Sequence, residues 1–196
     1  MRKLFSVLMA SLVLGAGLVP AANAFTISLV PQGSVVNPGG SVAVDVVASG
    51  LTDGTAPSLG AWDLNVSFDS SVLSVASVAF GTGLDVLGLG FNIQGFDDSA
   101  AGFVNAFEVS FDSTANLNSL QSGAFTLFTV TFSAASEGAS LLGLTSNALS
   151  SAEGAALTAS ALNGASVSIA PVPLPAAAWL LISALAAAGV FRRNEA

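Results

Sequence analysis

Carboxylates are the only strongly ionisable side chains between residues 25 and 170, because this stretch has no lysine, arginine, histidine, cysteine or tyrosine. Hard cations such as Ca²⁺ prefer carboxylate and carbonyl oxygens, so calcium is the one cofactor that suits this set of side chains. Two segments are weak calcium candidates: Asp97 with Asp98, and Asp112 with Asn116 and Asn118. Neither matches the D-x-[DN]-x-[DN]-G calcium loop, and Asp and Asn also favour turns, where they hydrogen-bond their own backbone. The sequence therefore favours turns here over a metal site.

Enzymatic chemistry lacks most of its usual side chains in the same stretch. Acid–base and nucleophilic catalysis at neutral pH mostly uses histidine, cysteine, lysine or tyrosine. Two carboxylates would suffice for glycoside hydrolysis, but no spacing identifies a pair. The glycine-rich residues 81–90 lack a lysine that would reach phosphates and a following amphipathic helix, which indicates a loop rather than a nucleotide site. We therefore expect a protein that is not an enzyme.

Charge is distributed very unevenly along the chain. All four cationic residues lie at the two ends, and 11 of the 12 acidic residues lie between 25 and 170, since only Glu195 falls outside. No ion pair can form within this body, and repulsion among its carboxylates must be relieved by spacing, salt or bound metal. Such a surface disfavours binding to nucleic acid or to an acidic lipid surface. Without cysteine, its stability must come from core packing.

The first 24 residues have the three parts of a secretory signal peptide. Arg2 and Lys3 form the basic start, an apolar run follows, and Ala22 and Ala24 fit the small-residue cleavage site. The mature chain would then begin at residue 25. The alternative is an uncleaved membrane anchor, which the short apolar run disfavours. The sequence thus predicts that the body is exported across the inner membrane.

The last 26 residues, 171–196, also have three zones. Prolines come first, an apolar stretch over 176–191 follows, and Arg192 and Arg193 close it. The apolar stretch predicts a transmembrane helix near the lower length limit for crossing roughly 30 Å of hydrocarbon. The arginines would keep the end of the chain cytoplasmic, which places the body on the far side.

This tail resembles the PEP-CTERM family of sorting signals in its VPLPA variant. The motif consists of Val172, Pro173, Leu174, Pro175 and Ala176. The resemblance implies recognition by an exosortase, a membrane protease that cuts near the motif, in a Gram-negative bacterium that produces exopolysaccharide. The helix would then be a temporary anchor, and the mature protein would lie at the cell surface or outside the cell. A permanent single-span anchor is the alternative.

The body has the length of one domain and the alternation of an all-β protein. Strands are predicted at residues 25–30, 41–48, 62–68, 72–80, 91–93, 103–111 and 125–132, with weaker ones at 141–145, 156–158 and 165–169. We expect bulges within 72–80 and 125–132, an acidic turn at 94–99 and a polar loop at 112–121. The total of about nine strands predicts a two-sheet β-sandwich.

Side-chain phase predicts which residues are buried. Trp62 alternates in phase with the apolar residues of 62–68, so it is expected in the core rather than on a sugar-binding platform, with Asp63 and Asn65 facing outward. Phe107 and Val109 share one face, opposite Glu108. All 13 phenylalanines are predicted to be packing residues, because no tyrosine accompanies them to suggest a recognition surface.

Three segments resemble the cohesin-type β-sandwich, a jelly roll similar to carbohydrate-binding modules. They are the turn and valine strand of residues 37–44, the alternating strand and Phe-Asp turn of 62–73, and the central strand of 123–132. Cohesins bind dockerin partners, so the resemblance implies binding through one sheet face. Taken with the two ends, we expect a non-enzymatic interaction or structural module in an exopolysaccharide or biofilm layer. The alternatives are a cohesin-type binding module for a polysaccharide or a partner protein, and a calcium-dependent adhesin.

Overall fold

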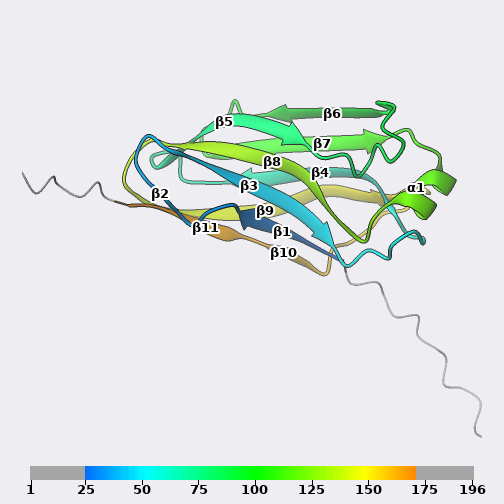
Figure 1. The fold of residues 1–196 in the computed structure, drawn as a ribbon. Coiled ribbons are helices and arrows are strands. Elements are labelled where there is room, and N and C mark those ends of the chain that lie inside the picture. The colour runs from blue at the N-terminus through cyan, green and yellow to red at the C-terminus, as the bar shows by residue number, and fades with distance from the viewer. Residues whose placement is uncertain (1–24, 171–196) are drawn as a thin grey trace, which may run out of the picture.

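The structure is a computed structural model that describes residues 25–170. The predicted signal peptide, sorting motif and transmembrane helix lie outside this range. Residues 25–170 contain eleven strands, which form two packed sheets, and one short helix (Figure 1); this confirms the all-β sandwich. Within residues 25–170 no helix has the length and apolar character needed to cross a bilayer. Both sheets and the core between them lie within this range.

The first sheet has five strands in the order β10-β1-β3-β8-β5. They are β1 (Thr26–Pro31), β3 (Ser41–Ser49), β5 (Leu73–Phe80), β8 (Ala124–Ala134) and β10 (Ala161–Asn163). Neighbours pair antiparallel except β1 and β10, which run parallel. The predicted bulges in β5 and β8 are confirmed as register shifts. The one in β8 falls at Leu127, so Leu127 and Phe128 are both buried.

The second sheet has six strands in the order β2-β11-β9-β4-β7-β6. They are β2 (Val35–Val36), β4 (Leu59–Ser67), β6 (Asn92–Asp97), β7 (Phe103–Ser110), β9 (Gly138–Ser151) and β11 (Ala165–Ile169). The strands from β11 to β6 pair antiparallel, and β2 adds a short parallel edge. This sheet carries the candidate site described below.

Aromatic stacking joins the two sheets at their centre. Trp62 of β4 is 1% exposed, and its ring stacks on Phe128 at 5.0 Å and on Phe80 at 6.0 Å between centroids. Offset aromatic pairs of this kind add about 0.5–1.5 kcal/mol beyond the area they bury. The prediction that Trp62 belongs to the core is confirmed.

One helix occupies the stretch predicted as a polar loop. Helix α1 spans Thr114–Leu120, and the Ser113 side chain caps it by accepting the N–H of Asn116. Leu117 is its one buried residue, so the sequence shows no helical periodicity that could have predicted it. The N-cap serine was the only available signal.

Strand boundaries differ from the prediction in three places. Strand β6 continues through residues 94–97, which were predicted as a turn, and β9 extends well beyond 141–145 on both sides. The predicted strand at 156–158 is wrong, because it forms only an isolated bridge between Ser150 and Ala156, and β10 follows instead. The parts of β9 beyond 141–145 are rich in glycine, serine and alanine, so pairing with neighbouring strands, not side-chain alternation, makes them extended.

The two ends of the described chain lie at opposite ends of the sandwich (Figure 1). Phe25 lies beside Ser160, whose N–H and hydroxyl both donate to its carbonyl oxygen. At the other end, Ile169 pairs with Gly138, and the N–H of Ala170 donates to Val36.

Candidate interaction surface

The candidate site is the outer surface of the second sheet over β9, β4, β7 and β6, which we call the outer face. Cross-strand pairing arranges its side chains in rows. One row contains Ile93, Val109, Ala61 and Ser150; the next contains Gly95, Phe107, Asp63 and Ala148; a third contains Asp97, Asn105 and Asn65. The first row is mainly apolar and the third is polar, so the outer face has an apolar end and a polar end.

Strand β7 determines the apolar end, because its phase is opposite to what hydrophobicity alone would choose. Val104, Ala106 and Glu108 point into the sandwich and are almost fully buried, whereas Phe107 and Val109 point outward. The sequence correctly placed Phe107 and Val109 opposite Glu108. It did not indicate that the carboxyl, rather than the aromatic ring, faces the core.

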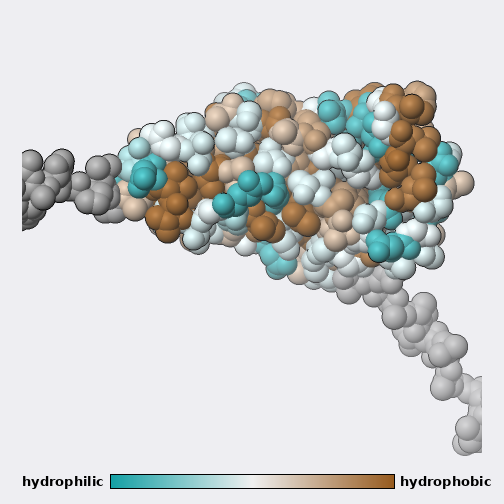
Figure 2. Space-filling model, viewed as in Figure 1, coloured by the Kyte–Doolittle hydropathy of each residue, from teal (hydrophilic) through white to brown (hydrophobic). Residues whose placement is uncertain are grey.

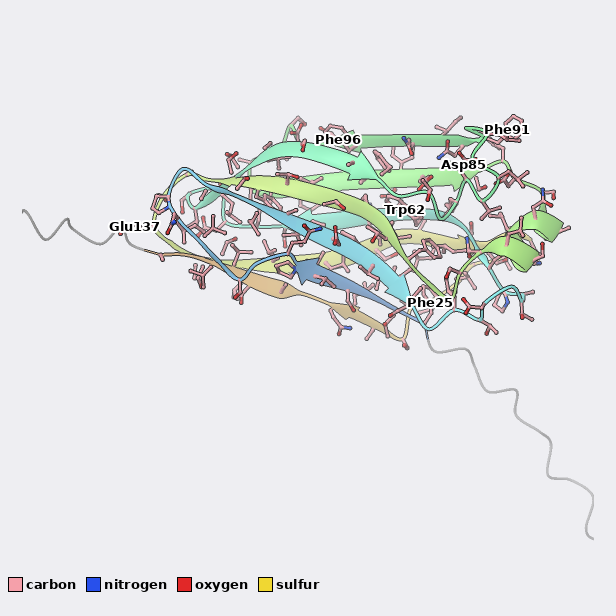
Figure 3. The ribbon with its side chains drawn as sticks, in the orientation of Figure 1. Phe25, Trp62, Asp85, Phe91, Phe96 and Glu137 are labelled. Atoms are coloured by element: carbon pink, nitrogen blue, oxygen red, sulfur yellow. The ribbon has the colours of Figure 1, made fainter. Side chains whose placement is uncertain are left out.

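The prediction that all phenylalanines are packing residues is therefore wrong. Phe91, Phe96, Phe103, Phe107 and Phe111 are between 37% and 62% exposed. Figure 2 shows hydrophobic residues gathered at the end of the molecule where Phe91 lies in Figure 3. Contiguous apolar surface of this kind commonly marks an interaction site.

A shallow hollow of about 200 Å³ opens in the apolar end. Phe107 and Val109 border it on one side, Ala148 and Ser150 on the other, and Ala61 lies between them. The Phe107 ring leans toward β6 over Gly95, where a Cβ would lie 2.9 Å from its ring atoms. Because Gly95 has no side chain, the Phe107 ring can lie over it. The ring therefore leaves the part of the outer face next to β9 uncovered.

The polar end is a hydrogen-bonded cluster of four side chains: Asp63, Asn65, Asn105 and Asn147. Asp63 Oδ1 accepts from the Nδ2 atoms of Asn105 at 2.6 Å and Asn147 at 3.0 Å. Asn105 also donates to Asn65 at 2.8 Å, and Asn65 donates to Asn147 at 2.9 Å. Asp63 and Asn65 point outward as predicted, and their neighbours hold them in fixed orientations.

A bulge in β9 brings Asn147 into this cluster. Asp63 pairs with Ala148 while the next residue, Leu64, pairs with Ser146, so Asn147 is the extra residue of β9. Bulges of this kind redirect a side chain toward a site. The sequence of β9 carries no alternation that locates the bulge, so Asn147 could not have been predicted.

Glu108 lies beneath the outer face and is 1% exposed. Burial raises the pKa of its carboxyl and nearby Asp85 adds to the rise, while a 2.6 Å hydrogen bond from Asn92 Nδ2 opposes it. Trp62 also lowers this pKa, although its indole N–H makes no well-aligned hydrogen bond within residues 25–170. Asp85, labelled in Figure 3, accepts the backbone N–H groups of Leu89 and Gly90 and so closes the loop beside this site.

The two calcium candidate segments lie at opposite ends of the β6–β7 pair. Asp97 and Asp98 lie at one end of β6, where Asp97 accepts the N–H of Ser99 and that bond lowers its pKa. Asp112 is buried beyond the opposite end of β7, with both carboxylate oxygens lacking a hydrogen-bond partner in the described chain. Asn116 and Asn118 belong to α1. Among residues 25–170 no group of three acidic, histidine or cysteine side chains is placed to hold a metal.

Asn118 instead forms structural bonds. Its Oδ1 accepts from the hydroxyl of Ser58 at 2.5 Å, and its Nδ2 donates to Glu153 at 2.7 Å. The helix is thereby linked to the segments before β4 and after β9.

The outer surface of the first sheet is different in character. Its strand β8 presents Thr129, Thr131 and Ser133, and Asp45 of β3 accepts hydrogen bonds from Thr129 and Gln32. This is an ordinary solvated sheet face. The apolar end is therefore a property of the second sheet and not of the sandwich in general.

No protein-family model and no curated protein match the chain. Solved structures match the chain, and the three described below are cohesin domains. A type II cohesin domain from the cellulosome of Acetivibrio cellulolyticus has a TM-score of 0.59 at 15% identity, covering 74% of this chain and 95% of that one. A cohesin from a type I cohesin–dockerin complex of Clostridium thermocellum has a TM-score of 0.58 at 15% identity, covering 74% and 99%.

A non-cellulosomal cohesin from the archaeon Archaeoglobus fulgidus is similar to the same extent, with a TM-score of 0.55 at 19% identity, covering 75% of this chain and 91% of that one. These likenesses span nearly the whole of each neighbour at low identity. The chain therefore has the fold of a cohesin domain.

Proposed function

We propose that this protein is a non-enzymatic module that binds a partner protein through its outer face. The phase of β7 carries the proposal. Exposing Phe107 and Val109 while burying Glu108 opposes stability, because burial favours apolar side chains and disfavours a carboxyl. Departures from the pattern that favours folding are expected at functional sites.

The composition of the outer face also supports a protein partner. Its apolar end resembles the core of a protein interface, and the pre-oriented cluster around Asp63 resembles a polar rim. The known complexes of structural neighbours with dockerins support the same class of partner. Trp62 is buried and no tyrosine is present, so the outer face lacks the indole and phenol rings on which sugars commonly stack.

The location of the module is part of the proposal. Residues 1–24 would direct export, an exosortase would recognise residues 172–176, and the helix over 176–191 would hold the protein in the membrane until it is cut. The module would then act at the cell surface or in an exopolysaccharide layer, as an interaction component rather than a catalyst.

The proposal is tested by changing the outer face without changing the fold. A Phe107→Ala, Val109→Ser double variant of residues 25–170 is compared with wild type in capture of proteins from the host's extracellular fraction. The captured partner is then purified and its binding measured directly by calorimetry. We expect at least tenfold weaker binding, about 1.4 kcal/mol, because central apolar residues dominate interface energies.

Thr131→Ala is the matched control, since Thr131 occupies a central strand on the opposite outer surface. It should bind the partner as wild type does. Equal binding by wild type and the double variant, with both folded, would remove the outer face as the interaction site.

A further inference from the structure

The four edges of the two sheets differ in how well they are protected. Exposed edge strands offer unpaired N–H and C=O groups to other chains, and proteins limit this with short strands, bulges, prolines or lysines. The edges β2 and β10 have two and three residues, and β5 is interrupted by a register shift between Val75 and Ser77. Three of the four edges thus carry a protective feature.

Strand β6 has none of these features. It pairs with β7 over six consecutive residues without a shift, and it contains no proline, lysine or arginine. Its exposed residues include two large apolar side chains as well as Gln94 and Asp97: Ile93 is 55% exposed and Phe96 is 46% exposed, and Phe91 just before the strand is 51% exposed. Figure 1 shows β6 along the upper border of the molecule, with no described segment beyond it.

Charge along this edge suits a second copy of the chain better than a charged partner. Eleven carboxylates are spread over the body, yet none lies between residues 91 and 96; the nearest are Asp97 and Asp98 at one end of the strand. A cationic partner would gain little opposite an uncharged edge. An identical edge running antiparallel would place each acidic end beside the uncharged start of the other strand.

One register fits this pairing well. Gln94 would lie opposite Gln94 of the other copy, Ile93 opposite Gly95, and Phe91 opposite Asp97, so that side chains on the same face meet. Ile93 would then contact the Phe107 ring that already covers Gly95. The two Asp97 carboxylates would lie about 20 Å apart, six residues at about 3.4 Å each, which is beyond the Debye length at physiological salt.

We propose that β6 pairs antiparallel with β6 of a second copy, which joins two second sheets into one continuous sheet of a symmetric dimer. Because the other edges are protected, this contact closes after two copies and does not propagate into a fibre. The dimer leaves both outer faces exposed side by side, so it would present two partner-binding surfaces at once.

The first measurement is the mass of residues 25–170 in solution by sedimentation and light scattering at about 100 µM. We expect twice the monomer mass. Raising the salt from about 0.1 M to about 1 M shortens the Debye length from about 10 Å to about 3 Å and should tighten the dimer severalfold, because both bodies are acidic. A monomer under all these conditions, or a dimer weakened by salt, would overturn the proposal.

Edge variants locate the contact. Ile93→Lys combined with Phe96→Lys places on β6 the protective charges that it lacks, and we expect a monomer that melts like wild type. Leu141→Lys is the matched control, since Leu141 is 80% exposed on β9, and it should remain dimeric. A dimer that survives the edge changes but is lost in Phe107→Ala would indicate face-to-face contact instead, and would contradict edge pairing.

Cross-linking tests the register. The chain has no cysteine, so Gln94→Cys introduces a single thiol at the expected symmetry axis. Directly opposite residues have Cβ atoms about 4.5–5.5 Å apart, close to disulfide range. Mild oxidation should convert most of this variant to a covalent dimer, while Leu141→Cys stays largely monomeric on denaturing gels. Equal cross-linking of the two variants would contradict the proposed register.

Discussion

At the scale of single residues, Glu108 shows how the candidate site differs from a fold selected for stability alone. Its carboxyl takes a core position between Trp62 and Asn92, and the apolar residues on either side of it face solvent. The side chain is hydrogen-bonded, so the arrangement is tolerated, but ionisation still carries a desolvation cost.

Replacing Glu108 with glutamine should stabilise the protein at neutral pH. Burial raises the pKa of Glu108 in the folded state, so its contribution to stability is present at acidic pH and is lost as the pH rises through the interval between its unfolded and folded values. Glutamine keeps an oxygen that can accept from Asn92 and has no charge to bury. We expect the free energy of unfolding at pH 7 to rise by on the order of 1 kcal/mol.

The measurement is denaturant unfolding of both proteins at pH 7 and pH 4. The advantage of Glu108→Gln should shrink at pH 4, where the wild-type carboxyl is increasingly protonated. A difference of the same size at both pH values would mean that ionisation of Glu108 does not determine it.

At the scale of secondary-structure elements, the alternating strands β3, β4 and β7 could be predicted because valine, tryptophan and alternating polar residues mark them clearly. Helix α1, strand β10 and the β9 bulge could not. Each depends on one or two buried residues or on pairing with a neighbour, and none of these leaves a periodic signal. Half of the polar end, Asp63 and Asn65, was predictable from the phase of β4, while Asn147 was not.

Gln121, at the end of α1, links this helix to the start of β4 and to the loop after β5. Its side chain is buried; Oε1 accepts the N–H of Leu59 at 2.7 Å, and Nε2 donates to the carbonyls of Leu59 at 2.8 Å and Gly83 at 3.0 Å. The side chain thus joins the start of β4 to the loop after β5. It supplies both with backbone hydrogen bonds that a neighbouring strand would otherwise make.

Gln121→Ala should therefore be strongly destabilising, by about 2–4 kcal/mol, because it leaves buried backbone groups without partners. Gln94→Ala is the control, since Gln94 is exposed and should change stability by less than about 0.5 kcal/mol. Thermal and urea unfolding measure both. A loss below about 1 kcal/mol in Gln121→Ala would show that water replaces these hydrogen bonds.

At the scale of the whole molecule, the sequence predicted a β-sandwich whose carboxylates have no cationic partners within it. It did not predict which of the two outer surfaces would be apolar. In the strands of both sheets, successive side chains point to opposite faces. This alternation alone does not determine which set of side chains faces the other sheet. The two surfaces become distinct only once β7 is placed with Glu108 inward.

The predicted processing of the full chain has a direct test in the mass of the protein recovered from its host. We expect a polypeptide that begins at Phe25 and ends near residues 172–176, which has lost Trp179, Arg192 and Arg193. Intact-mass spectrometry of the surface and extracellular fractions measures this. Recovery of a chain that still carries both arginines would indicate a permanent anchor, and recovery of the entire leader would contradict export.

The two ends of the described chain lie at opposite ends of the sandwich (Figure 1), and the hydrophobic surface around Phe91 lies at the end away from the last described strand (Figure 3). A tether attached after Ala170 would therefore leave the length of the sandwich between its point of attachment and this hydrophobic surface. Shortening or lengthening the segment after Ala170 would then leave the surface around Phe91 unchanged.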